Sequence, residues 1–164
     1  MSSSAPYRVL FVCLGNICRS PAAEIIFNAV AAKAGLARRV QADSCGTASY
    51  HTGSRPDSRM LAALERAGYT YGGHRARTFC RADFSNFDLI IPQDEFNERD
   101  IRQLARCVSD NAKVQGMWLW FGEEETEKSV PDPYYGSAED FDAVVALLTR
   151  SMERLVADLS AVGC

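Results

Sequence analysis

The chain has 164 residues, of which 47% are hydrophobic, and a formal net charge of −3. A chain of this size can bury its own core, so a single domain is expected over residues 1–164, with residues 1–6 as a flexible N-terminus. The mildly acidic balance argues against nucleic-acid partners, and no apolar run reaches the ~20 residues that a membrane span needs. Without a recognisable secretion signal, a cytoplasmic protein is expected, with its six cysteines as thiols.

Strand and helix patterns alternate along the chain. In chain order they are a strand at 7–12, a helix at 20–34, a strand at 40–44, a helix at 56–67, a strand at 87–91, a helix at 97–106, a strand at 113–119 and a helix at 138–159. This alternation predicts an α/β fold: a three-layer, doubly wound sheet of about four parallel strands flanked by helices. In such folds ligands bind beyond the carboxyl ends of the strands.

The segment between the first strand and the first helix has the composition of an anion-binding loop. Cys13 ends the strand, Gly15 and Asn16 permit tight or left-handed backbone, and the loop leads into a helix N-terminus. Successive N–H groups of such a loop can point at one tetrahedral oxyanion, to which Arg19 adds a bidentate guanidinium. The predicted phosphate-binding residues are Leu14, Gly15, Asn16, Ile17, Cys18 and Ser20.

Cys13 is the candidate nucleophile. The positive field of the loop favours its thiolate, so phosphoryl transfer to sulfur is predicted. A purely structural, buried Cys13 is the commoner fate of cysteine but leaves Arg19 unexplained. Cys18, His51 and His74 raise the alternative of a zinc site, yet two cysteines separated by four residues without a second pair fit such a site poorly. No metal or cofactor is therefore expected.

A cysteinyl-phosphate mechanism also requires a proton donor for the leaving oxygen and later a base for water. One carboxyl group can serve in both steps. Asp132 is the candidate, because Pro131 and Pro133 hold it in a rigid loop before the last helix. Taken alone, an aspartate between prolines is more typical of a simple turn.

Two segments together carry a specific resemblance. Residues 12–21, VCLGNICRSP, and residues 132–135, DPYY, resemble the low-molecular-weight protein tyrosine phosphatase family, over almost the whole chain. The resemblance implies the phosphotyrosine protein phosphatase I-like fold and metal-free hydrolysis of phosphotyrosine proteins or small aryl phosphates. It implies Cys13 as the nucleophile, Arg19 as the phosphate clamp and Asp132 as the general acid and base.

The resemblance also implies supporting residues around the loop. Asn16, Ser20, Ser44 and His74 match positions whose hydrogen bonds shape the loop, and Ser20 would in addition stabilise the leaving thiolate. Asp94 matches a position after the third strand and is interpreted as structural, as a helix cap.

Two further predictions concern the mouth of the site. Tyr50, Tyr134 and Tyr135 are predicted to wall a slot deep enough for a phosphotyrosyl ring, and the alternative is that they are simply surface aromatics. Cys18 is predicted to capture an oxidised Cys13 as a disulfide.

Two other functions compete with hydrolysis. Arsenate reductases resemble these phosphatases but need two resolving cysteines about seven residues apart. This chain has Cys80, but Phe87 stands where the second cysteine would be. A non-catalytic phosphotyrosine-binding module would typically lack Cys13, Arg19 or Asp132, and all three are present. The oligomeric state and the physiological substrate do not follow from the sequence.

Overall fold

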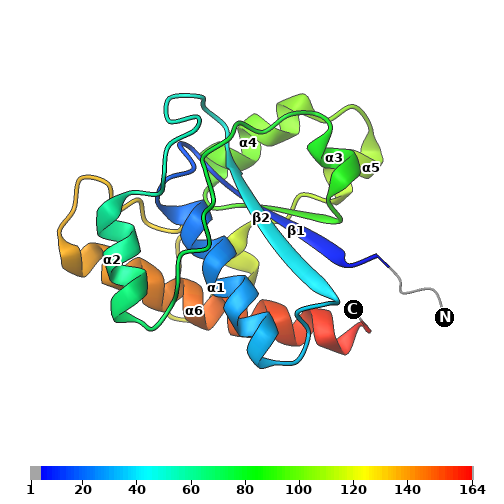
Figure 1. The fold of residues 1–164 in the computed structure, drawn as a ribbon. Helices are drawn as coiled ribbons and strands as arrows, with labels where there is room; N and C mark the ends of the chain where they lie inside the picture. The colour runs from blue at the N-terminus through cyan, green and yellow to red at the C-terminus, as the bar shows by residue number, and fades with distance from the viewer. Residues whose placement is uncertain (1–4, 164) are drawn as a thin grey trace.

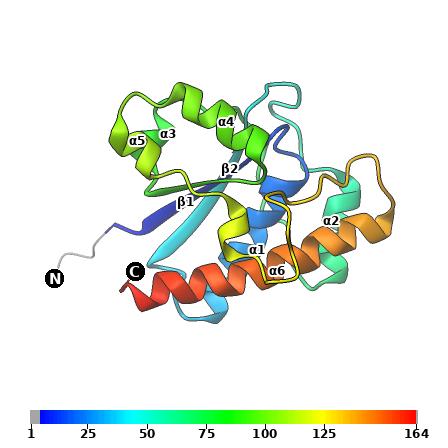
Figure 2. The same ribbon diagram turned by 180° about the vertical axis from the view of Figure 1, so that it is seen from behind.

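The computed structural model describes residues 5–163 and places a parallel sheet between two layers of helices (Figure 1). The strands pair in the order β2-β1-β3, with β1 (Tyr7–Cys13), β2 (Val40–Gly46) and β3 (Leu89–Pro92). One side of the sheet carries α1 (Arg19–Lys33), α2 (Ser58–Arg66) and α6 (Ala138–Ala161), and the other carries α3 (Asp83–Asn86), α4 (Glu95–Leu104) and α5 (Val108–Ala112) (Figures 1 and 2). The predicted flexible N-terminus falls mostly on residues 1–4, which lie outside the described residues.

Side chains of β1 alternate between two cores. Val9 and Phe11 enter the larger core, which α1, α2 and α6 complete, whereas Leu10 and Val12 enter the smaller core on the side of α3 and α4. All four side chains are fully buried. Successive side chains of a strand point to opposite faces, so a strand covered on both sides is apolar throughout. This explains the continuous apolar run at 7–12 and confirms the predicted class of fold.

The predicted strand at 113–119 is wrong in type. Val114 forms a single parallel bridge with Ile90, and the chain then enters a 3₁₀ helix, η1 (Met117–Trp120). Residues three apart share a face of a 3₁₀ helix, so Met117 and Trp120 both reach the larger core. The Trp120 indole N–H also donates to Asp158 of α6, at 2.9 Å. Packing against α6 therefore replaces a fourth strand.

Helix α4 begins two residues earlier than predicted. The Asp94 carboxylate accepts a hydrogen bond from the backbone N–H of Asn97, at 2.7 Å, so the helix starts at Glu95. This confirms the interpretation of Asp94 as a cap. Helices α3 and α5, with four and five residues, are too short to show a periodic pattern and were not predicted.

The sheet brings three connections to one edge. The loops that follow β1, β2 and β3 all leave from carboxyl ends of parallel strands, where ligands bind in such folds. Of the helices in residues 5–163, none has the length and apolarity to cross a membrane.

Candidate active site

The loop of residues 14–18 folds back over the end of β1. Asn16 has a φ of 56°, a left-handed conformation that asparagine tolerates better than most residues. Its backbone N–H then donates to Cys13 Sγ, at 3.3 Å, and Ser20 Oγ lies 3.0 Å from the same sulfur. The loop thus surrounds the sulfur with polar hydrogens just before the N-terminus of α1.

Two glycines allow this loop to pack closely. A Cβ atom on Gly46, at the end of β2, would lie 2.6 Å from the carbonyl oxygen of Leu14. A Cβ atom on Gly15 would lie 2.9 Å from the His51 ring. Gly15 is therefore needed for the approach of an imidazole rather than for the left-handed turn, which Asn16 alone supplies.

Arg19 is buried and fixed through one nitrogen. Its Nη1 donates to Asp94 Oδ2, at 2.7 Å, and to the carbonyl oxygen of Val130, at 3.1 Å, while Nη2 lies 3.7 Å from Asp132 Oδ2. Burial lowers the pKa of Arg19, but Cys13, Asp94 and Asp132 outweigh it and hold the pKa above its usual value. The guanidinium is consequently a permanent cation in a set orientation.

A pocket of about 310 Å³ opens over the loop. It gathers the three predicted catalytic residues and the three predicted tyrosines, together with His51. The lining residues are Cys13, Leu14, Gly15, Ile17, Cys18, Arg19, Tyr50, His51, Asp132, Tyr134 and Tyr135.

The rim of the pocket is built by the loop before α6. Asp132 is half exposed, and its Oδ1 accepts a hydrogen bond from the backbone N–H of Tyr134, at 3.1 Å. Tyr134 packs against the larger core and lies edge-on to Tyr135, with ring centroids 4.9 Å apart. Tyr135 is 96% exposed, and Tyr50 on the loop after β2 is also exposed. Tyr134 is therefore anchored in the core, whereas Tyr50 and Tyr135 are exposed and each contacts a neighbouring ring edge-on.

Cys18 differs from a reactive cysteine although it lines the same pocket. Burial raises its pKa to about 12, and the charges of Asp57, Cys13 and Asp132 act in the same direction. Cys18 therefore stays a protonated thiol at neutral pH. The cysteines at positions 13, 18, 45, 80 and 107 are all unbridged.

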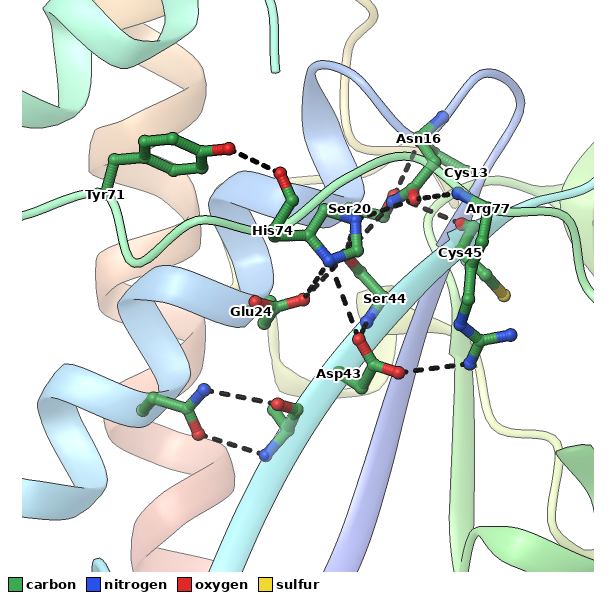
Figure 3. Close-up of polar contacts among 12 residues, drawn as sticks. Cys13, Asn16, Ser20, Glu24, Asp43, Ser44, Cys45, Tyr71, His74 and Arg77 are labelled. Carbon is green, nitrogen blue, oxygen red and sulfur yellow. Dashed lines mark hydrogen bonds and ion pairs between the residues drawn. The ribbon is translucent and has the colours of Figure 1, made fainter. Parts of the chain in front are cut away.

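A buried network supports the loop from behind (Figure 3). The Asn16 amide donates to Ser20 Oγ, at 2.8 Å, and to Ser44 Oγ, at 3.0 Å. Its oxygen accepts from His74 Nε2, at 2.8 Å, and from the backbone N–H of Arg77, at 3.1 Å. The structure thus brings together all four residues that were predicted to shape the loop.

Behind this network lie charged residues that the sequence patterns do not predict. Ser44 donates to Glu24 Oε1, at 2.8 Å, and Arg77 pairs with Asp43, at 3.1 Å. Glu24 lies about one helical turn after Ser20, so both side chains are on the same face of α1. This spacing in the sequence could have indicated that Glu24 lies close to the loop. Burial, with the charge of Asp43, raises the pKa of Glu24 to about 8 against the hydrogen bond from Ser44, and burial lowers the pKa of His74.

The role of Asp94 as the anchor of Arg19 was also missed. The position of Asp94 just after the carboxyl end of the third strand was the one feature of the sequence that indicated this role. The zinc alternative with Cys13 and Cys18 finds no support, because the one group of three potential ligands within residues 5–163 is Glu24, Asp43 and His74.

This is a cysteine-based site for a tetrahedral anion. It combines a cysteine at a strand end, a loop of backbone N–H groups, a helix N-terminus and a fixed guanidinium. The family model of the low molecular weight phosphotyrosine protein phosphatases matches residues 8–162. The chain belongs to this family, whose members are protein-tyrosine phosphatases.

Individual relatives extend over almost the whole chain. The low molecular weight phosphotyrosine protein phosphatase of Schizosaccharomyces pombe is 43% identical over 90% of this chain and 94% of its own. The crystal structure of a protein tyrosine phosphatase from Entamoeba histolytica superposes with a TM-score of 0.90 at 35% identity, covering 96% of this chain and 99% of the other. The YwlE arginine phosphatase has the same fold, with a TM-score of 0.82 at 23% identity over 93% of this chain and 95% of its own.

Proposed function

We propose that this enzyme hydrolyses phosphotyrosine in proteins, and small aryl phosphates, through a cysteinyl phosphate on Cys13. The observation that carries the proposal is the placement of Cys13, Arg19 and Asp132 around one pocket with aromatic walls. The nucleophile lies at the base of the pocket, the cation is fixed beside it, and the carboxyl group lies at the rim.

In the first step the Cys13 thiolate attacks phosphorus and the bond to the phenolic oxygen breaks. Asp132 gives its proton to that oxygen, so the leaving group departs as a neutral phenol. Arg19 and the N–H groups of the loop stabilise the charge on the three other phosphoryl oxygens. Nη1 of Arg19 is held by Asp94 and Val130, so the guanidinium needs little reorganisation.

In the second step water attacks phosphorus and the sulfur–phosphorus bond breaks. Asp132, now ionised, takes a proton from the water, and inorganic phosphate forms. The Cys13 thiolate is the leaving group. The Ser20 hydroxyl lies 3.0 Å from the sulfur and 3.2 Å from the carbonyl oxygen of Cys45, and it donates its one proton to the sulfur as the thiolate forms. The Ser20 hydroxyl oxygen accepts a hydrogen bond from the Asn16 amide, so the hydroxyl proton points away from that amide.

The aromatic walls favour a flat phosphoester that reaches the base of the pocket. Tyr134 and the two exposed tyrosines can contact a phenyl ring, whereas phosphoserine is too short to reach Cys13 and fill the slot. The fold by itself does not choose the amino acid, since an arginine phosphatase shares it. A cytoplasmic location stays a prediction.

Neither competing function gains support from the geometry. Phe87 packs in the smaller core and Cys80 is exposed, so the thiol relay of an arsenate reductase lacks its second member at this place. Binding without turnover would leave the rim position of Asp132 without a purpose.

Hydrolysis of aryl phosphates by the parent, Cys13→Ser and Asp132→Asn proteins tests the proposal. Cys13→Ser is expected to abolish turnover, and Asp132→Asn to reduce kcat by about 10²–10⁴-fold, more for phenyl phosphate than for a nitrophenyl ester that needs no proton. Cys107→Ser and Asp142→Asn, both exposed, are the matched controls and should keep full activity.

Phosphotyrosine and phosphoarginine are then compared as substrates of the parent protein. Preferential release of phosphate from phosphotyrosine is expected. Full activity of Cys13→Ser would end the mechanism, and a preference for phosphoarginine would overturn the substrate assignment.

A further inference from the structure

Three potential metal ligands meet behind the phosphate-binding loop, and none of them lines the pocket (Figure 3). His74 Nδ1 lies 3.2 Å from Glu24 Oε1 and 3.6 Å from Asp43 Oδ1. Glu24 comes from α1, Asp43 from β2 and His74 from the loop before α3. Their convergence is therefore a product of the fold rather than of one local turn.

The hydrogen bonds of Asn16 decide which histidine nitrogen carries a proton. The Asn16 oxygen accepts from the backbone N–H of Arg77, which can only donate, so the amide nitrogen must face Ser20 and Ser44. His74 Nε2, 2.8 Å from the same oxygen, is then the protonated nitrogen. In the neutral ring, the Nδ1 lone pair faces the two carboxylates.

Glu24 Oε1 and Asp43 Oδ1 each accept one hydrogen bond from Ser44, at 2.8 Å, and each keeps a lone pair that, with the lone pair of Nδ1, can hold a cation. A proton satisfies two of the three atoms, and a metal ion satisfies all of them. In tetrahedral zinc coordination with bonds of about 2.0–2.1 Å, neighbouring ligand atoms lie about 3.4 Å apart. The two separations from His74 Nδ1, 3.2 and 3.6 Å, bracket this value, and the two carboxylate oxygens lie within 4.8 Å of each other.

Each of the three ligands also has a second partner that fixes its orientation. Ser44 donates to Glu24, Arg77 pairs with the other oxygen of Asp43, and Asn16 accepts from His74. Such outer contacts are characteristic of metal ligands and raise affinity.

The local charge also calls for a divalent ion. Arg77 pairs with Asp43 and Asp83, and Glu24 adds a third carboxylate beside His74, which leaves two negative charges when all of them are ionised. Access from solvent is open, since the Asp43 side chain is 35% exposed.

We propose that Glu24, Asp43 and His74 Nδ1 bind one divalent transition-metal ion of the Zn²⁺ class, with water as the remaining ligand. One imidazole with two carboxylates suits Zn²⁺ better than Mg²⁺ or Ca²⁺, which prefer oxygen alone. Binding releases the proton of the cluster to solvent. The ion holds His74, which holds Asn16, so it stiffens the loop without entering the pocket.

Zinc titration by calorimetry in a Cys13→Ser background tests this site, because that background removes the thiolate of the pocket. Saturable binding of one ion is expected. Glu24→Gln and, independently, Asp43→Asn should each weaken it by at least about tenfold. Glu65→Gln, on the exposed face of α2, is the matched control and should bind as the background does. A thermal melt without zinc checks that each variant is folded.

Imidazole nitrogen NMR gives a second readout, because the chain has two histidines, His51 and His74. Zinc should shift Nδ1 of His74 while Nε2 keeps its proton, and His51→Gln assigns the signals. No saturable binding, equal binding by Glu24→Gln, or a shift of His51 alone would overturn the proposal and leave the cluster as a proton-bridged structural network.

Discussion

The two sides of the phosphate-binding loop are organised in opposite ways. On the pocket side, Asp132 is half exposed and Tyr135 is almost fully exposed. On the network side, Asn16, Ser20 and Ser44 are completely enclosed and bonded to one another. Enclosed hydrogen bonds are stronger and more rigid than solvated ones. The difference teaches that the reacting groups stand where a substrate can reach them, whereas their geometry is set where water cannot.

Arg19 joins the two kinds of environment. Its guanidinium faces the pocket, yet the residue is only 4% exposed and is held by Asp94 and Val130. Arg19 is therefore the pocket residue whose function depends most on rigid support. Substitution of Arg19 perturbs the pocket side, and substitution of Asn16 perturbs the network side, so the two can be compared.

Among the substitutions that compare the two sides of the loop, the largest effect is expected for Arg19→Lys. Lysine keeps the charge but loses the planar, bidentate donors, so kcat/KM for an aryl phosphate should fall by about 10²–10³-fold. Arg99→Lys, on the exposed face of α4, is the control and should be unchanged. Near-parental kinetics of Arg19→Lys would mean that charge alone suffices in the pocket.

Asn16→Ala tests the network side and should cost stability as well as activity. It removes four hydrogen bonds and places alanine at a φ of 56°, so the free energy of unfolding should fall by about 3 kcal/mol. Asn28→Ala removes two bonds at an exposed position and should cost about 1 kcal/mol or less. Urea unfolding measures both, and equal losses would refute the importance of enclosure.

Cys18→Ser should affect recovery from peroxide rather than turnover. The sulfenic acid of Cys13 can condense with the Cys18 thiol to a disulfide and water, which a thiol later reduces. Recovery of activity after peroxide and reductant should therefore be high in the parent and in Cys107→Ser, and low in Cys18→Ser. If Cys18→Ser recovers as fully as the parent, the predicted disulfide is wrong.

Alkylation at neutral pH checks the protonation of Cys18 in the same samples. Burial raises the pKa of Cys18 to about 12, while the hydrogen bond with Ser109 lowers the pKa of Cys107. Because the thiolate is the reactive form, iodoacetamide should label Cys107 faster than Cys18, and labelling of Cys18 should increase only at strongly alkaline pH.

The smallest effect is expected for Tyr135→Ala. The side chain is 96% exposed, so its loss should raise KM by about threefold and leave the thermal midpoint unchanged. Tyr134→Ala, which also removes contacts with the larger core and with Arg59, should lower the thermal midpoint as well. If both variants behave alike, the distinction between an anchored and an exposed wall fails.

Local patterns determined much of this protein. The apolar run of β1, the loop of residues 13–20 and the aspartate before α6 are each encoded in a few consecutive residues, since strand periodicity, turn chemistry and helix starts depend on near neighbours. The alternation of elements then predicted the doubly wound fold, and with it the edge where the site lies.

Only the tertiary structure decided which residues meet around that loop. The bond between Arg19 and Asp94 spans 75 positions and that between Asn16 and His74 spans 58. No local pattern specifies such partners, because they depend on how the helices and loops pack on the sheet. The same packing turned the expected fourth strand into η1 against α6, and it assembled Glu24, Asp43 and His74 behind the loop.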